Sequence, residues 1–176
     1  WSDRAWGVVK QNVKFADNPF QLGVASGDPA PDSVVLWTRL HAPGLFGSRL
    51  PDAPVTVRWE LAHDEAFSRI VQKGQTQALP ELAHSVHVEA GGLDSDRSYF
   101  YRFMVGGSAN DWVSPVGRTR TLPAPDARAA RLRLAYASCQ RWEHGYFSAW
   151  RHLVVDQPDA VVFLGDYIYE YPGAVN

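Results

Sequence analysis

Hydrophobic and polar residues alternate with a period of two through much of the first two thirds of the chain. The clearest example places Val55, Val57, Trp59 and Leu61 on one face, with polar residues between them. Other strand-like runs are residues 33–40, 69–75, 85–89, 99–105 and 116–122. Six or seven such strands separated by turn residues, with no convincing helix among them, predict a β-sandwich over residues 20–122.

Two loops refine this prediction. Residues 93–99, LDSDRSY, resemble the corner of fibronectin type III domains, in which a leucine precedes a buried tyrosine by six residues. The hydroxyl of that tyrosine bonds back to the corner backbone; the alternative is a polar hairpin loop before an aromatic strand. Residues 23–29, GVASGDP, suggest a phosphate-binding loop but lack its Gly-Lys-Ser/Thr ending and a following helix, so we expect a turn between strands.

The pattern changes after a linker at residues 123–130, which contains two prolines. Residues 1–19 show no period and are expected to form an N-terminal arm. A strand at 131–138, a helix at about 145–156 and a strand at 160–164 predict a βαβ unit with parallel strands.

The predicted helix places Phe147, Trp150, Leu153 and Val154 on one face, and Pro158 ends it. A single βαβ unit cannot bury both faces of its sheet. Residues 131–176 are therefore expected to be the incomplete start of an α/β domain.

Composition narrows the function classes. The 176 residues are 45% hydrophobic, without an apolar run long enough to cross a membrane, and their formal net charge of −2 argues against nucleic acid. One cysteine excludes an internal disulfide. The chain begins at Trp1, so a processed or engineered N-terminus is expected, with any targeting peptide already removed.

Candidate chemistry lies where the two strands of the βαβ unit end. The apolar run 161–164 leads into Gly165 and Asp166, which delivers a carboxylate to the edge where open α/β sheets bind ligands. Asp166 is therefore a metal or catalytic candidate, and the alternative is a turn or helix cap. Tyr169 follows three residues later, so a turn can bring its oxygen to the same ion, and the alternative is a tyrosine that only packs.

The single cysteine, Cys139, follows the other strand, 27 residues before Asp166. It admits three interpretations: a small buried hydrophobe, a thiolate ligand for a transition metal, or a nucleophile with His144 or His152 nearby. His84 and His87 are separated by an odd number of positions on a strand, which is poor geometry for one metal, so both are expected to be structural.

Taken together, these residues resemble the N-terminal portion of PhoD-type alkaline phosphatases. The matching segments follow the family order over nearly the whole chain: 22–29 (LGVASGDP), 33–40 (SVVLWTRL), 83–89 (AHSVHVE), 114–117 (SPVG), 137–140 (ASCQ), 143–146 (EHGY) and 164–171 (LGDYIYEY).

The resemblance implies a fibronectin-like sandwich followed by a calcineurin-like metallophosphatase core that hydrolyses phosphate monoesters and diesters. It implies that Cys139, Asp166 and Tyr169 bind Fe³⁺ and that Asp166 bridges to Ca²⁺, with a bridging oxygen attacking phosphorus. It also implies a secreted, twin-arginine-exported enzyme. The remaining ligands are expected beyond Asn176, on a second polypeptide fragment left associated after a nick.

Two other hypotheses stay open from the sequence. Some actinobacterial phospholipases D resemble the same family, so the substrate could be a phospholipid. Alternatively, residues 20–122 form a non-enzymatic binding or spacer module and Cys139 and Asp166 are merely structural.

Overall fold

A computed structural model describes residues 15–41, 50–106, 111–128, 131–141, 143 and 145–169. The chain divides into two compact units, Trp1–Ala127 and Arg128–Asn176, which are described separately. Within the described residues no helix has the length and apolar character needed to cross a membrane. The predicted limits of the N-terminal arm and of the linker stay predictions.

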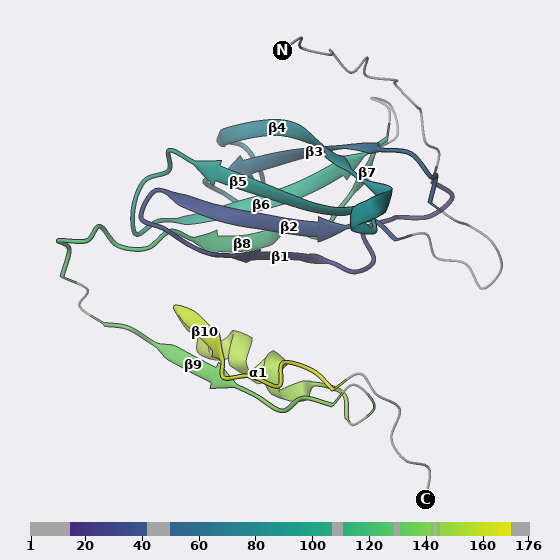
Figure 1. The fold of residues 1–176 in the computed structure, drawn as a ribbon. Helices are drawn as coiled ribbons and strands as arrows, with labels where there is room; N and C mark the ends of the chain where they lie inside the picture. Colours follow the sequence, from purple (N-terminus) through teal and green to yellow (C-terminus); the bar gives the residue numbers. More distant parts are fainter. Residues whose placement is uncertain are drawn as a thin grey trace, which may run out of the picture. The chain divides into compact units, whose positions relative to one another are not determined.

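The first unit is an antiparallel β-sandwich (Figure 1). One sheet has the order β1 (Val24–Gly27), β2 (Ser33–Arg39) and β5 (Ser85–Gly91). In the other sheet, β4 (Ile70–Ala78) pairs with β3 (Val55–Ala62), and β3 pairs with β6 (Ser98–Val105). Two short strands, β7 (Trp112–Val113) and β8 (Gly117–Arg120), both pair with β6, and a 3₁₀ turn, η1, spans Pro80–Leu82. The predicted fibronectin-like sandwich is confirmed.

The period-two pattern identifies the core of this sandwich. On β3, Val55, Val57 and Leu61 are buried, and Trp59 packs against the cluster from its edge. The inward residues of the other long strands close the same core: Val34 and Leu36 of β2, Val86, Val88 and Ala90 of β5, and Tyr99, Tyr101, Phe103 and Val105 of β6.

The predicted tyrosine corner is present. The hydroxyl of Tyr99 accepts a hydrogen bond from the backbone N–H of Asp94 at 2.9 Å, and Leu93 is buried. The Tyr99 ring also stacks on His63, with ring centroids 5.5 Å apart. The corner therefore links the turn before β6 to the sandwich core.

The interpretation of residues 23–29 as a turn was wrong in part. Residues 24–27 form β1, which pairs antiparallel with β2 from Val24 opposite Thr38 to Gly27 opposite Val35. The turn begins only at Asp28, whose φ is 45°. Strand β2 follows this turn, so the helix N-terminus that cradles phosphate in a phosphate-binding loop does not follow it.

Strand β8 follows β7 after an irregularity at Ser114 and Pro115. The register on β6 changes by one residue, from Val105 opposite Trp112 to Tyr101 opposite Gly117. The Ser114 hydroxyl accepts the N–H of Phe103 at 2.9 Å, which satisfies a buried backbone donor where the ladder is interrupted.

The second unit is a βαβ segment, as predicted. Strand β9 (Leu134–Ala137) pairs in parallel with β10 (Ala160–Phe163), and α1 (Ser148–Asp156) lies between them in the chain. The helix begins at Ser148, after the predicted start, because Gly145 and Phe147 have positive φ values of 85° and 51°.

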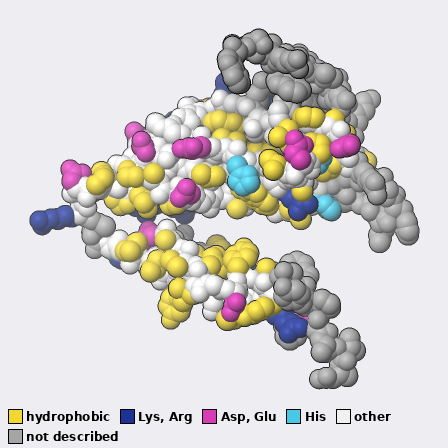
Figure 2. All heavy atoms as spheres, in the orientation of Figure 1, with side chains coloured by type: hydrophobic (Ala, Val, Ile, Leu, Met, Phe, Trp, Pro, Cys, Tyr) yellow, Lys and Arg dark blue, Asp and Glu magenta, His cyan; other side chains and the backbone are white. Residues whose placement is uncertain are grey.

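The predicted apolar face of this helix is correct only in part. Trp150 and Leu153 are half-buried, whereas Val154 is 73% exposed. Figure 2 shows hydrophobic side chains gathered on the surface of this unit. The exposed apolar residues of this unit include Val161, Val162 and Phe163 of β10, each at least 37% exposed.

Candidate metal centre

The candidate residues lie beyond the carboxyl ends of two parallel strands. Cys139 follows β9 by two residues and Asp166 follows β10 by three. Parallel strands end at the same edge of a sheet, which is where α/β folds bind ligands. The structure therefore brings the predicted thiol and carboxylate to one edge.

Backbone pairing continues past the strands and holds the two loops together. The N–H of Leu164 donates to the carbonyl of Ala137 at 2.9 Å, and the N–H of Cys139 donates to the carbonyl of Asp166 at 2.8 Å. The N–H of Tyr169 then donates to the carbonyl of Gln140 at 2.7 Å. These bonds hold the two loops side by side.

Both candidate ligands have left-handed backbone conformations. The φ angle is 59° at Cys139 and 46° at Asp166, and it is 104° at the preceding Gly165. Aspartate tolerates this region, but a cysteine there is uncommon. Strained backbone of this kind persists only where surrounding structure imposes it, and it clusters at functional sites.

The Cys139 thiol donates a hydrogen bond to Oδ2 of Asp166, with 3.6 Å between sulfur and oxygen. Cys139 is exposed, so the interpretation of this residue as a small buried hydrophobe is wrong. A carboxylate neighbour supplies no positive charge, which is what stabilises a nucleophilic thiolate. His152 is exposed on α1, and His144 lies outside the described residues. The geometry favours a ligand over a nucleophile.

Tyr169 completes the group. Its hydroxyl hydrogen-bonds the Asp166 carboxylate, and this bond raises the pKa of Tyr169 well above its ordinary value. Partial burial and the Cys139 thiol act in the same direction. The side chains of Cys139, Asp166 and Tyr169, each of which can carry negative charge, thus form one interacting group. The Tyr169 phenol keeps its proton in this group. A cation would reverse this preference by stabilising the anionic forms.

The donor chemistry fits the metals that the resemblance implied. Thiolate and phenolate suit a ferric ion, and the two carboxylate oxygens of Asp166 suit contact with a hard cation such as calcium. No group of three His, Cys, Asp and Glu side chains gathers within the described residues; here the third donor is a tyrosine. Calcium takes six to eight oxygens, so two cations would need further ligands.

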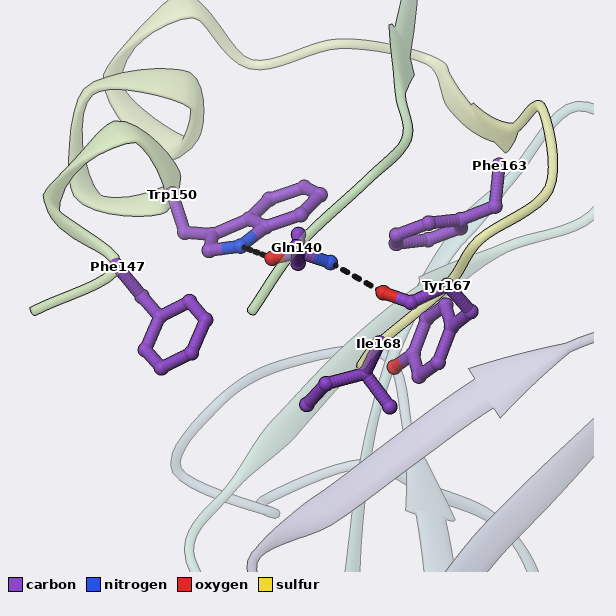
Figure 3. A pocket seen from close by; sticks show the side chains of 6 residues that line it. All are labelled: Gln140, Phe147, Trp150, Phe163, Tyr167 and Ile168. Carbon is purple, nitrogen blue, oxygen red and sulfur yellow. Dashed lines mark hydrogen bonds between the residues drawn. The ribbon is translucent and has the colours of Figure 1, made fainter. Parts of the chain in front are cut away.

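One residue of this site was missed from the sequence. Gln140 lies in the ASCQ segment, but its partners were not predicted. Its side chain lies in a hollow of about 400 Å³ on this unit (Figure 3). Aromatic and aliphatic side chains line the rest of the hollow: Phe147, Trp150, Phe163, Tyr167 and Ile168.

Comparison with known proteins agrees with this arrangement. The family model "PhoD-like phosphatase, N-terminal domain" matches residues 7–123, and the model "PhoD-like phosphatase" matches residues 134–176. Alkaline phosphatase D of Bacillus subtilis (strain 168) is 54% identical over 163 residues, which is 93% of this chain and 27% of that protein.

A solved structure described as "Structure of PhoD" superposes with a TM-score of 0.83 at 53% identity, over 90% of this chain and 30% of that chain. The chain thus spans less than a third of the relatives that it matches. The two family models together match most of the chain, in the order sandwich and then βαβ unit. The chain therefore belongs to the PhoD-like phosphatase family.

Proposed function

We propose that this chain is part of a metal-dependent hydrolase of phosphate monoesters and diesters and supplies one wall of its active site. The observation that carries the proposal is the meeting of a thiol, a carboxylate and a phenol at the carboxyl edge of β9 and β10. The chain belongs to a phosphatase family, and this membership supports a role of the three side chains in phosphate-ester hydrolysis.

In this proposal Cys139, Asp166 and Tyr169 would hold ferric iron, and Asp166 would also serve as a ligand for calcium. Cys139 and Tyr169 must lose their protons to bind, so metal loading releases protons. Until then, Asp166 holds the Tyr169 proton in a hydrogen bond. When bound, the cations would supply positive charge that stabilises the charge developing on the phosphoryl oxygens.

The rest of the site is proposed to come from further polypeptide, as a continuation of the chain or as an associated second fragment. The chain spans 27% of alkaline phosphatase D, and the apolar side chains of β10 are exposed. Parallel sheets are normally covered on both faces. Denaturing mass spectrometry of active, metal-loaded protein should therefore show polypeptide beyond the 19.6 kDa of this chain. Activity from that species alone would contradict the proposal.

Location outside the cytoplasm is part of the same proposal and is supported by the family resemblance. Radioactive or antibody detection in culture medium, cell wall and cytoplasmic fractions would test it. Retention of the active enzyme in the cytoplasm would contradict it.

The deciding experiment is metal analysis combined with visible absorption. Metal-loaded protein should contain iron and show a tyrosinate-to-iron charge-transfer band, and Tyr169→Phe should abolish that band. Tyr146→Phe is a matched control, because Tyr146 is 99% exposed in the same unit. Iron-replete protein without the band would refute the role of Tyr169.

Substrate class needs a separate comparison. Turnover of a p-nitrophenyl phosphate ester should exceed turnover of a phospholipid if the protein acts as a general phosphoesterase. The reverse order would indicate a phospholipase D-type enzyme. Absence of both activities and of iron would favour a non-enzymatic sandwich module.

A further inference from the structure

Gln140 joins the two loops of the candidate metal centre to the helix. Its Nε2 donates to the backbone carbonyl of Tyr167 at 3.0 Å, and its Oε1 accepts the indole N–H of Trp150 at 2.5 Å. Figure 3 shows the carboxamide between these two partners, with Trp150 approaching from α1. One side chain therefore contacts both the segment after β10 and the helix.

The anchored atoms lie directly beside the candidate ligands in the chain. Gln140 follows Cys139, and Tyr167 follows Asp166. The backbone carbonyl of Gln140 also accepts the N–H of Tyr169 at 2.7 Å. Gln140 therefore hydrogen-bonds the loop after β10 at two points, at Tyr167 through its side chain and at Tyr169 through its backbone.

The partners explain why a carboxamide stands at this position. The Tyr167 carbonyl can only accept a hydrogen bond, and the Trp150 indole can only donate one. A carboxamide offers one group of each kind without charge. An ionised glutamate would accept from the indole but could not donate to the carbonyl, and a leucine would do neither.

Ring packing holds the same partners in place. Trp150 lies 5.5 Å from Phe163, and Phe163 lies 4.5 Å from Tyr167, measured between ring centroids. Phe163 is the last residue of β10, so the helix, the strand end and the loop form one packed group. Trp150 is thus linked to the loop in two ways, through these rings and through Gln140.

We propose that Gln140 is a positioning residue that holds the Asp166–Tyr169 loop at the distance from Cys139 needed to bind one metal ion. This inference rests on the metal centre of the proposed function. It concerns how that centre is held, and Gln140 itself is not a ligand.

The test compares metal-loaded protein carrying Gln140→Leu with wild type and with Gln72→Leu. Gln72 is the matched control, because its Nε2 also donates to a backbone carbonyl, that of Gly91 in the sandwich. Loss of a residue that orients ligands typically weakens metal binding by about 10–100-fold. Gln140→Leu should therefore release iron to a chelator at a concentration at least about tenfold lower, with a shifted charge-transfer band.

Trp150→Phe provides a second variant that keeps an aromatic ring on α1 and removes the indole N–H together with part of the ring surface that packs on Phe163. It should shift the band in the same direction as Gln140→Leu but less, whereas Gln72→Leu should leave it unchanged. Near-ultraviolet circular dichroism would show that each variant is folded.

The outcomes separate the two proposals. Wild type without iron or the band would refute the metal centre and this inference with it. Wild type with the band, together with Gln140→Leu and Trp150→Phe that match Gln72→Leu in band position and iron retention, would overturn the positioning role alone.

Discussion

In the sandwich, the inward side chains of β2, β3, β5 and β6 are almost inaccessible to solvent, whereas none of the described residues of the βαβ unit is buried. Both units are rich in apolar residues, so composition does not account for the difference. The sandwich has two sheets that cover each other's apolar faces, while the parallel pair β9–β10 has one helix in the described part of its unit. A parallel sheet needs cover on both faces. The sandwich therefore holds its own core, whereas the described part of the βαβ unit does not.

The largest expected effect comes from separating the units. Residues 1–127 alone should unfold in one cooperative thermal transition, because their core lies within the sandwich. Residues 128–176 alone should show no transition, because a chain this short without a core is unstable. Circular dichroism on heating measures both. A cooperative transition in the shorter piece would show that the βαβ unit has a core of its own.

A matched pair of phenylalanines tests burial directly. Phe103→Ala removes a ring that is 0% exposed and should lower the free energy of unfolding by about 3–5 kcal/mol. Phe163→Ala removes a ring that is 39% exposed and should cost less than about 1.5 kcal/mol. Chemical denaturation of the whole chain gives both values. Equal losses would show that Phe163 belongs to a core as closed as that of the sandwich.

Alkaline pH should destabilise the sandwich through Tyr101. Burial raises the pKa of Tyr101 to about 12, against 10.0 for the free side chain, although a hydrogen bond with Ser26 lowers it in part. Below pH 10 both the folded and the unfolded chain keep the proton, so the full stability is present. Between pH 10 and about 12 only the unfolded chain ionises, and stability falls by up to about 3 kcal/mol.

Denaturation curves at pH 9, 10, 11 and 12 measure this loss. Tyr101→Phe serves as the control, because it keeps the ring and removes the titrating hydroxyl. Its stability should fall less over the same range than that of wild type. Parallel curves for the two proteins would contradict the assignment to Tyr101.

The smallest effect concerns close packing between neighbouring strands. A Cβ at Gly117 would lie 2.2 Å from the Tyr101 ring, so Gly117→Ala should lower the free energy of unfolding by about 1–3 kcal/mol. Gly27→Ala is the control, since nothing lies within 4 Å of its added Cβ, and its effect should stay within about 0.5 kcal/mol. If Gly117→Ala left the free energy of unfolding unchanged, the Tyr101 ring would be free to move away from the added methyl group.

The period-two pattern of the sequence predicted strands correctly where they are long and have one buried face. It placed β2, β3, β5 and β6, because buried residues recur at every second position along much of each strand. It missed β1, whose four residues VASG show no alternation and whose strand character comes from pairing with β2. It also missed β7, which has only two residues and lies before the predicted run 116–122, on the other side of the irregularity where Ser114 bonds to Phe103.

The same contrast holds for the candidate metal centre. The order of strand, helix and strand by itself placed Cys139 and Asp166 at one edge, because parallel strands end together. The left-handed conformations of both residues were not predictable, since neither residue type requires them. The hydrogen bond between Tyr169 and Asp166 depends on the path of the loop after β10.

The two kinds of unit and the inward face of the long strands could be predicted from the sequence, because they follow from local periodicity. The βαβ order placed Cys139 and Asp166 at one edge of a sheet, whereas the resemblance to a known family implied Tyr169 as a third ligand. The contacts of Gln140 with both Trp150 and Tyr167 are visible only in the folded structure. A carboxamide has no preferred partner in sequence. Its role is set by which donor and which acceptor the fold places within reach.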